Sequence, residues 1–305
     1  MTILVTGSSG LVGSALKKNI SDDVFFAARE DADLTSFEQT FELFRKVKPS
    51  RVIHLAALVG GIGGNLMHSG EYFRNNTLIN LNVLESARMH KVERLISFMS
   101  TCVFPNDGPY PLEAKNLHLG PPHPSNFGYA YAKRMLEVQS RAYRAQWGHD
   151  YLVAVPTNIY GPDDNFNLTE GHVVPALIHK TYLAKKANEP LVIWGSGKPM
   201  REFVYSHDIA KLTLWMMEKY NSDEPLILSS GIETPIVDLV DQIVAHVGFE
   251  GEIVFDSLKP DGQFRKPSDS QTLKKLNSDF NFTGLNLGLE KTVGWFTENY
   301  PDVRV

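Results

Sequence analysis

The sequence predicts an α/β protein, in which a Rossmann-type, doubly wound parallel sheet is joined to a smaller, discontinuous α/β substrate-binding lobe. In the first half of the chain, short runs of apolar, β-branched residues alternate with longer stretches of helical period. A glycine-rich turn separates the first such run from the first helical stretch. After Pro156 the pattern becomes irregular and rich in Gly, Asp, Asn and Pro, which indicates a second, loop-rich unit.

The first half accounts for the sheet. Thr35 begins a capping box with Glu38 and is expected to open a helix that runs to about Val47. Two further helices fit residues 71–90 and 128–147. The expected strands cover residues 3–7, 24–28, 51–57, 94–100 and 151–156.

The second half predicts a helix at 174–187 and strands at 191–194 and 201–205. A further helix and strand between 207 and 230 are expected to return to the first sheet. We therefore assign residues 1–165, with a return segment at 205–230, to a first, larger domain. Residues 166–204 and 231–305 are assigned to the substrate-binding lobe.

The composition of the chain argues against nucleic acid and membranes as binding partners of the protein. The net charge of −5 argues against a broad nucleic-acid surface, and no stretch approaches the ~18 apolar residues of a membrane span. The chain enters a strand directly from its first residues and contains a single cysteine, Cys102, so it has no internal disulfide. These features predict a cytoplasmic protein that binds neither nucleic acid nor membrane. No metal site is expected.

The glycine-rich turn reads "TGSSGLVG" and places glycines at positions 7, 10 and 13. Gly7 permits the tight turn, Gly10 lets the backbone approach a pyrophosphate, and Gly13 lets the helix pack closely on the strand. An ordinary glycine-rich turn is the alternative, but the position between strand and helix favours dinucleotide binding. The cofactor loop would comprise Gly7, Ser8, Ser9, Gly10, Leu11, Val12 and Gly13.

The end of the second strand indicates which dinucleotide is bound. An NAD-preferring fold usually has an acid there, whereas this sequence has Arg29, a cation suited to a 2′-phosphate. We therefore predict NADP(H). A solvated Arg29 is the alternative, and the neighbouring Glu30 weakens the distinction. Asp33 is a candidate acceptor for the adenine amino group.

A tyrosine and a lysine lie one helical turn apart at Tyr129 and Lys133. A nearby ammonium favours tyrosinate, so we expect Lys133 to lower the pKa of Tyr129. A core tyrosine beside a snorkelling lysine is the alternative for an isolated pair. Here the pair follows the glycine loop and a strand that ends in Ser100, which matches a serine, tyrosine and lysine group on a dinucleotide fold.

These motifs resemble the extended short-chain dehydrogenase/reductase family. Within it, further segments resemble the family of GDP-L-fucose synthases: "HLAALVGGIGGN", "STCVFP", "PPHPSNFGYAYAKRM", "PTNIYGPDDNFN", "GHVVPALIHK", "WGSGKPMREFVY" and "KPDGQFRK". The resemblance extends over most of the chain. It implies epimerisation of GDP-4-keto-6-deoxy-D-mannose at carbons 3 and 5, followed by reduction of the 4-keto group with NADPH to GDP-L-fucose.

The same resemblance implies roles for the catalytic residues. Dehydratases of the family carry Asp and Glu where this chain has Cys102 and Val103, which argues against dehydration. Cys102 would take protons from the two carbons flanking the keto group, and His172 would return them from the other face. Tyr129 would supply the proton for reduction, Lys133 would hold the ribose, and Ser100 would bind the keto oxygen.

The resemblance also implies the binding residues. Lys180 and Arg201 would contact the diphosphate, Trp194 would lie against the nucleotide, and Asp261 would hydrogen-bond a hydroxyl. The helices at 71–90 and 128–147 would pair with their copies in a homodimer. The nicotinamide end of the cofactor site would be lined by Pro156, Thr157, Asn158 and Ile159, with His172 and Lys133 also at the cofactor.

Two alternatives remain open from the sequence. The first is another sugar-nucleotide epimerase or reductase on the same fold, such as a 4-epimerase that retains NAD; Arg29 and Cys102 argue against it. The second is a dinucleotide-sensing regulator without catalysis, since one fold can host both roles. The complete set of Ser100, Tyr129 and Lys133 argues against the second alternative.

Overall fold

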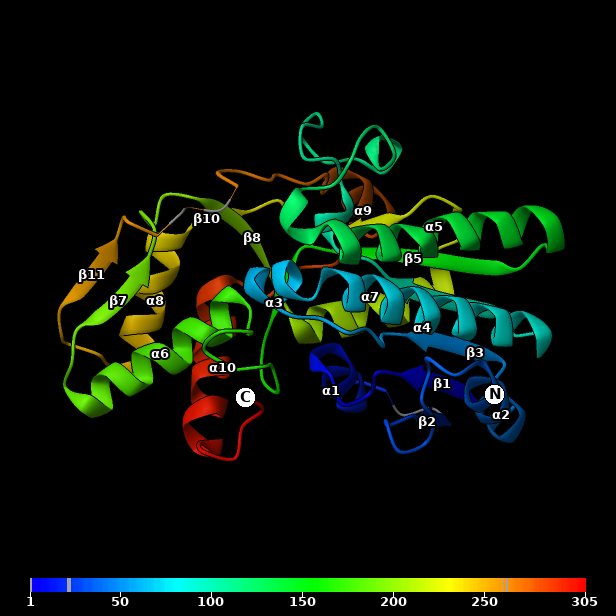
Figure 1. The fold of residues 1–305 in the computed structure, drawn as a ribbon, viewed down its shortest axis with the longest axis horizontal. Coiled ribbons are helices and arrows are strands. Elements are labelled where there is room, and N and C mark those ends of the chain that lie inside the picture. The colour runs from blue at the N-terminus through cyan, green and yellow to red at the C-terminus, as the bar shows by residue number, and fades with distance from the viewer. Residues whose placement is uncertain (1, 21–22, 260, 262) are drawn as a thin grey trace.

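The computed structural model describes residues 2–20, 23–259, 261 and 263–305. A six-stranded parallel sheet of order β2-β1-β3-β4-β5-β9 forms the centre of the larger lobe (Figure 1). Its last strand, β9, is separated from β5 in the chain by residues 157–225, yet pairs with it. The strands are β1 (Ile3–Thr6), β2 (Val24–Phe26), β3 (Arg51–His54), β4 (Arg94–Phe98), β5 (Asp150–Pro156) and β9 (Leu226–Leu228).

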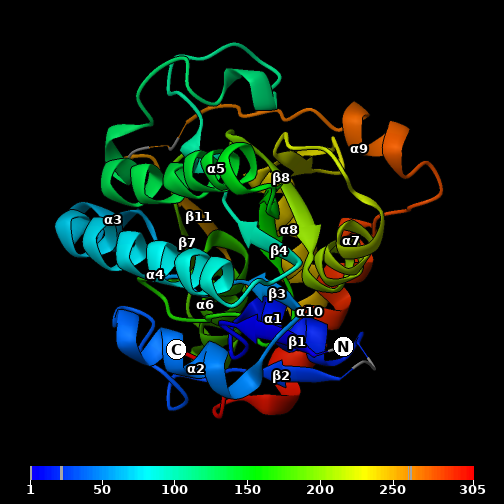
Figure 2. The ribbon, with the colours of Figure 1, turned by 90° about the vertical axis from the view of Figure 1, so that its right-hand side faces the viewer.

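Helices cover both faces of this sheet, as a doubly wound fold requires. Alternate residues of one strand point to opposite faces. Leu4 and Val52 thus belong to one buried cluster, and Val5 and Ile53 to another. Figure 2 shows α4 (Ser69–Met89) and α5 (Phe127–Trp147) on one side of the strands, and α7 (Ser206–Lys219) on the other. α2 (Phe37–Val47) packs against α4, and α1 (Leu11–Lys17) against α7.

The second lobe has its own core between two small sheets and three helices. β6 (Asn158–Tyr160) and β10 (Glu233–Pro235) flank β8 (Met200–Tyr205) in one sheet. β7 (Leu191–Trp194) pairs with β11 (Ile253–Asp256) in the other. The helices are α6 (Val173–Ala187), α8 (Ile236–Val247) and α10 (Leu285–Asn299), while the short helices α3 (Ile62–Met67) and α9 (Gln271–Leu276) lie in the connections.

Most expected elements are present, and their ends differ by a few residues. The helix cap is a correction: Ser36, not Thr35, caps α2 by accepting a hydrogen bond from the Gln39 N–H at 3.3 Å. Thr35 instead donates its hydroxyl to Asp33. The cap therefore lies one residue later than predicted, although the helix ends at Val47 as expected.

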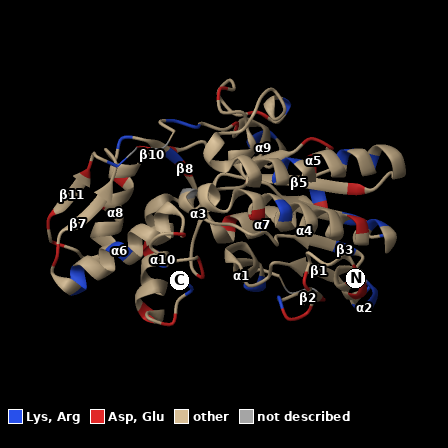
Figure 3. Ribbon diagram, in the orientation of Figure 1, with Lys and Arg blue, Asp and Glu red and all other residues tan. Residues whose placement is uncertain are grey.

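Charge is distributed without a dominant sign. Lys and Arg are mixed with Asp and Glu over both lobes in Figure 3. Within the described ranges, no helix combines the length and hydropathy needed to cross a membrane. Among those same residues, no group of three or more His, Cys, Asp or Glu side chains is arranged to hold a metal ion.

Candidate active site

The glycine loop joins β1 to α1 and passes very close to neighbouring backbone. Gly7 has φ +70°, and a Cβ there would lie 2.5 Å from the Ala56 nitrogen. A Cβ on Gly13 would lie 2.6 Å from the Ser8 carbonyl oxygen. The Gly10 N–H donates to the Gly7 carbonyl at 3.1 Å, which closes the turn. Side chains at Gly7 and Gly13 would fill space that the folded backbone needs, so this loop fits the close backbone approach of a dinucleotide site.

The non-glycine residues of the loop divide into two groups. Ser8 is buried and donates its hydroxyl to the Ala27 carbonyl at 2.9 Å, so its side chain anchors the loop to the end of β2. Val12 is buried in the sheet core. Ser9 is exposed and Leu11 partly exposed, which leaves the outer side of the loop accessible.

Arg29 and Asp33 both lie exposed after β2. One carboxylate oxygen of Asp33, Oδ1, accepts from the Thr35 N–H at 2.9 Å and from the Thr35 hydroxyl at 2.8 Å. These bonds hold the pKa of Asp33 below its usual value, and the positive charge of Arg29 acts in the same direction. Asp33 thus stabilises the turn before α2 and interacts electrostatically with Arg29.

Ser100, Cys102, Tyr129 and Lys133 come together where β4 ends against α5. Ser100 follows β4, and its hydroxyl oxygen accepts from the Cys102 N–H at 3.4 Å. Lys133 is buried and donates its ammonium to the Phe98 carbonyl at 2.9 Å. Tyr129 lies one turn earlier on α5. At the start of α5, a Cβ on Gly128 would meet the Ser69 carbonyl at 2.3 Å, so glycine permits the close contact with α4.

The expected effect of Lys133 on Tyr129 is not found. Burial raises the pKa of Tyr129, and negative charge at Cys102 and Tyr72 adds to that rise. Burial also lowers the pKa of Lys133 to about 8, and its ammonium is bonded to the Phe98 carbonyl. Tyr129 is therefore held in its protonated form, which suits a group that donates a proton.

Cys102 is partly buried in the core and lies among cations. A negative charge at Cys102 favours the charged forms of Lys133, Arg134 and Lys266, so all three are within electrostatic reach. Arg134 also donates to the Val103 carbonyl at 2.5 Å and to the Gly120 carbonyl at 2.8 Å. Cys102 therefore shares this site with three cationic side chains.

His172 stands immediately before α6 and precedes its first residue. Neighbouring protein atoms partly desolvate His172 and so lower its pKa, although the residue keeps solvent-exposed surface. The positive charge of Arg304 lowers the pKa of His172 further. The neighbouring Glu170 carbonyl accepts from the Gly61 N–H at 3.0 Å, which ties this loop to the one after β3. In the described part of the chain, no hydrogen bond joins His172 to the group around Tyr129.

The segment 156–159 lies where the sheets of the two lobes meet. The Thr157 N–H donates to the Leu228 carbonyl at 3.3 Å, and the Asn158 amide donates to the Glu202 carbonyl at 2.8 Å. Pro156 ends β5, while Ile159 continues into β6. The buried Thr157 hydroxyl oxygen has no hydrogen-bond partner among the described residues.

The predicted substrate residues lie on α6, β7, β8 and the segment after β11. Arg201 donates to the carbonyls of Met200 and Gln263, both at 2.7 Å, and burial lowers its pKa. Trp194 is 65 % exposed, and the Lys180 ammonium lies 5.7 Å from the centroid of its ring. Asp261 accepts from Ser196 N–H at 2.8 Å and from its hydroxyl at 2.7 Å, so it braces the turn after β7.

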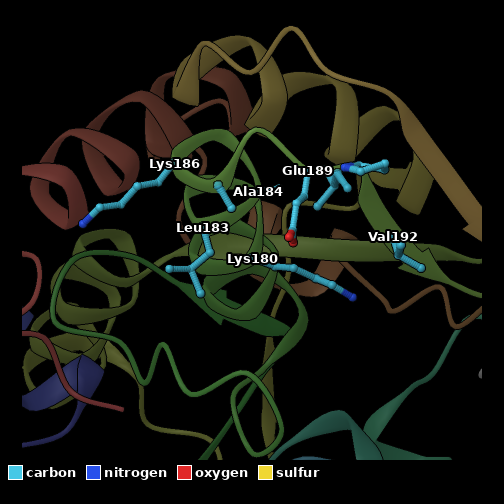
Figure 4. Close-up of a pocket in the computed structure, with 9 residues that line it drawn as sticks. Lys180, Leu183, Ala184, Lys186, Glu189 and Val192 are labelled. Atoms are coloured by element: carbon cyan, nitrogen blue, oxygen red, sulfur yellow. The ribbon is translucent and has the colours of Figure 1, made fainter.

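A cavity of about 370 Å³ lies between α6 and β7 (Figure 4). Lys180 is its only lining residue among those predicted to bind substrate, and the remaining lining comes from residues 183–192. None of the residues around Tyr129 lines it. The cavity therefore belongs to the second lobe and is separate from the group at the end of β4.

Three further residues act on this site and were not among the residues predicted from the sequence. Tyr72, on α4, affects the pKa of Tyr129. Lys266, more than 160 residues after Cys102 in the chain, interacts electrostatically with both Cys102 and Arg201. Arg304 lies beside the glycine loop and acts on His172. Contacts between segments so distant in sequence arise only on folding.

Comparison with known proteins gives consistent results. Residues 3–229 match the model of the NAD dependent epimerase/dehydratase family. The chain is 46 % identical to a GDP-L-fucose synthase of Dictyostelium discoideum, over 99 % of this chain and 97 % of that protein. It is 32 % identical to a GDP-L-fucose synthase of Escherichia coli, over 99 % and 98 % of the two chains. A GDP-L-fucose synthetase structure from Naegleria fowleri bound to NADP superposes with a TM-score of 0.94 at 39 % identity, covering 100 % of this chain and 96 % of that one.

Proposed function

Because the chain belongs to the GDP-L-fucose synthases of the NAD dependent epimerase/dehydratase family, we propose that it makes GDP-L-fucose from GDP-4-keto-6-deoxy-D-mannose. It epimerises the sugar at carbons 3 and 5 and then reduces the 4-keto group with NADPH. One observation in the structure carries this proposal: Cys102, in the field of three cations, lies beside Ser100 and Tyr129 where β4 ends.

Epimerisation uses the acidity of the carbons flanking the keto group. Cys102, as thiolate, takes a proton from each of these carbons, and negative charge develops on the keto oxygen. The hydroxyl groups of Ser100 and Tyr129 donate hydrogen bonds to that oxygen. His172, in its imidazolium form after taking a proton from solvent, delivers that proton to the deprotonated carbon from the opposite face of the sugar, and its lowered pKa makes the imidazolium a stronger acid. One proton-transfer group on each face allows the configuration to invert.

Reduction requires a proton donor at the keto oxygen. When bound, NADPH supplies the hydride. Tyr129, with its raised pKa, donates its phenolic proton to the oxygen as the carbon is reduced. Lys133 holds the cofactor ribose and presents a positive charge near that oxygen. The close glycine loop and the exposed Arg29 support NADP(H), with Arg29 opposite the 2′-phosphate.

The GDP moiety is held by the second lobe. Arg201 and Lys180 bind the diphosphate, Trp194 packs against the nucleotide, and Asp261 accepts from a hydroxyl. These roles agree with the proposed domains. Residues 1–165 and 205–230 bind the cofactor, and residues 166–204 and 231–305 bind the substrate. The ammonium groups of Lys180 and Lys259 both lie over the Trp194 ring. The ring and the two positive charges together support binding of an anionic nucleotide at this position.

We also propose a homodimer formed through α4 and α5. These helices pack side by side on the outside of the larger lobe (Figure 2). They expose large apolar side chains, and a second copy of the same face would cover them. The exposed residues are Phe73, Leu81, Met89, Phe127, Val138 and Trp147. A single free cysteine, Cys102, supports a reducing cytoplasmic setting.

The test incubates the purified protein with GDP-4-keto-6-deoxy-D-mannose and NADPH. Absorbance at the nicotinamide band and the identity of the sugar product are followed together. NADPH oxidation coupled to formation of GDP-L-fucose is the expected result. Oxidation that yields an unepimerised 6-deoxy sugar, or no oxidation, would contradict the assignment.

A further inference from the structure

The last residues of the chain lie against the glycine loop. Figure 1 shows the C-terminus between α10 and α1. Arg304 points its guanidinium at the loop, with Nη1 3.4 Å from the Ser9 carbonyl oxygen. The main-chain carbonyl of Arg304 accepts from the Phe166 N–H at 2.8 Å, and Val303 before it is buried. The tail is therefore held in place independently of the Arg304 side chain.

The side-chain carboxyl of Asp164 lies near Arg304 without forming a hydrogen bond to it. Asp164 Oδ1 lies 3.9 Å from Arg304 Nη2, which is too far for a hydrogen bond. Asp164 is 2 % exposed, and its Oδ2 has no hydrogen-bond partner among the described residues. Burial raises the pKa of Asp164 to about 7. The carboxyl is thus only about half ionised at pH 7, so it offsets the positive charge of Arg304 incompletely.

A second cation near the glycine loop is already paired. Lys18, at the end of α1, forms an ion pair with Asp163 at 2.9 Å. Arg304 is partly exposed, with 46 % of its side chain accessible, and so can turn toward a ligand on the loop. The loop residue that it touches, Ser9, lies between Gly7 and Gly10, whose backbone makes the close turn.

We propose that Arg304 is a further cofactor-binding residue, whose guanidinium binds the pyrophosphate of the dinucleotide lying on the glycine loop. This inference rests on the proposed function. A guanidinium donates two parallel hydrogen bonds to a phosphate. Burial favours the neutral form of the neighbouring Asp164 carboxyl and so reduces the repulsion that a carboxylate would exert on the anion. Arg304, the residue before the C-terminal Val305, thus lines the cofactor site beside the glycine loop.

The test measures equilibrium binding of NADPH to the cofactor-free protein by nicotinamide fluorescence at fixed ionic strength. Arg304→Gln is expected to weaken NADPH binding by about tenfold or more, the usual effect of losing a charged hydrogen bond. Arg304→Lys, which keeps the charge, is expected to lose less. Lys18→Gln, the matched control, removes a nearby charge that is paired with Asp163 and is expected to change binding less than threefold.

A truncated ligand separates a pyrophosphate contact from general damage to the loop. Adenosine 2′-phosphate lacks the pyrophosphate, so Arg304→Gln is expected to bind it as the unaltered protein does. Arg29→Gln is expected to weaken both ligands. Equal NADPH affinity of Arg304→Gln and the unaltered protein would overturn the inference, as would equal weakening of both ligands by Arg304→Gln. Failure of the unaltered protein to bind NADPH would instead overturn the proposed function, and this inference with it.

Discussion

The ammonium of Lys133 donates a hydrogen bond to the main-chain carbonyl of Phe98 across 2.9 Å. This bond joins α5 to the last residue of β4, two residues before Ser100. It fixes the position of the lysine without using a carboxylate. The positive charge is therefore available both to Cys102 and to a cofactor.

The first prediction concerns pH. Burial lowers the pKa of Lys133 to about 8, so the side chain is charged below that pH and neutral above it. We expect kcat for NADPH-dependent reduction to fall as pH rises through about 8. Lys133→Met should lose at least about 100-fold in kcat at pH 7 and show no such fall. A wild-type profile that stays level to pH 9.5 would argue against a catalytic charge on Lys133.

The second prediction separates epimerisation from reduction. Cys102→Ser should lower the rate at which solvent deuterium enters carbons 3 and 5 by at least about 100-fold, because a hydroxyl is a far weaker base than a thiolate. Slow reduction of the unepimerised keto sugar should persist, since Tyr129 and Lys133 are retained. The labelled product is analysed by NMR, and NADPH binding serves as the control. Deuterium entry at the wild-type rate would remove Cys102 from the mechanism.

The third prediction concerns the glycine loop. Gly7→Ala would place a Cβ 2.5 Å from the Ala56 nitrogen at a φ of +70°, so we expect a loss of about 1–3 kcal/mol in stability and a large loss of NADPH affinity. Gly294→Ala, in α10, is the control, because nothing lies within 4 Å of its added Cβ. This second change should stabilise by about 0.5–1 kcal/mol. Denaturant unfolding measures both, and equal effects would contradict the strained loop.

The fourth prediction concerns the buried carboxyl of Asp164. Its pKa rises from 3.8 in the unfolded chain to about 7 on folding, so the folded state binds the proton more tightly. Stability should be lost as pH rises from about 4 through about 7, by as much as about 4 kcal/mol.

Asp164→Asn removes this titration and keeps an oxygen to accept from the Asn165 N–H, a bond of 2.7 Å in the present structure. The variant should match the unaltered protein at pH 4 and exceed its melting temperature by several degrees at pH 8. Parallel melting curves at all pH values would show that Asp164 is ionised when folded.

Local patterns allowed much of the site to be predicted. The spacing of Gly7, Gly10 and Gly13, and the one-turn separation of Tyr129 and Lys133, depend on short-range geometry that the sequence displays. The α2 cap was displaced by one residue because Thr35 and Ser36 can both cap a helix, and Asp33 engages Thr35. The direction of the Tyr129 pKa shift was wrong because it depends on burial, which spacing does not show.

Long-range contacts explain what could not be predicted. Folding of the second lobe brings Lys266 close to Cys102 and Arg304 close to Ser9. A basic residue taken singly gives no sign in the sequence of which distant residue it will approach. β6, β10 and β11 are strands of three or four residues whose pairing partners lie far away in the chain. Such short strands owe their existence to those partners rather than to their own propensity.

The position of β9 constrains how the protein can be made. The edge of β5 stays unpaired until residues 226–228 have left the ribosome, although β5 itself is complete at Pro156. During synthesis of the intervening 69 residues, from 157 to 225, a nascent chain therefore exposes the edge of a hydrophobic strand. The first lobe thus cannot complete its sheet on the ribosome until residues 166–204 of the second lobe have been translated, and this interval is when a chaperone would be needed.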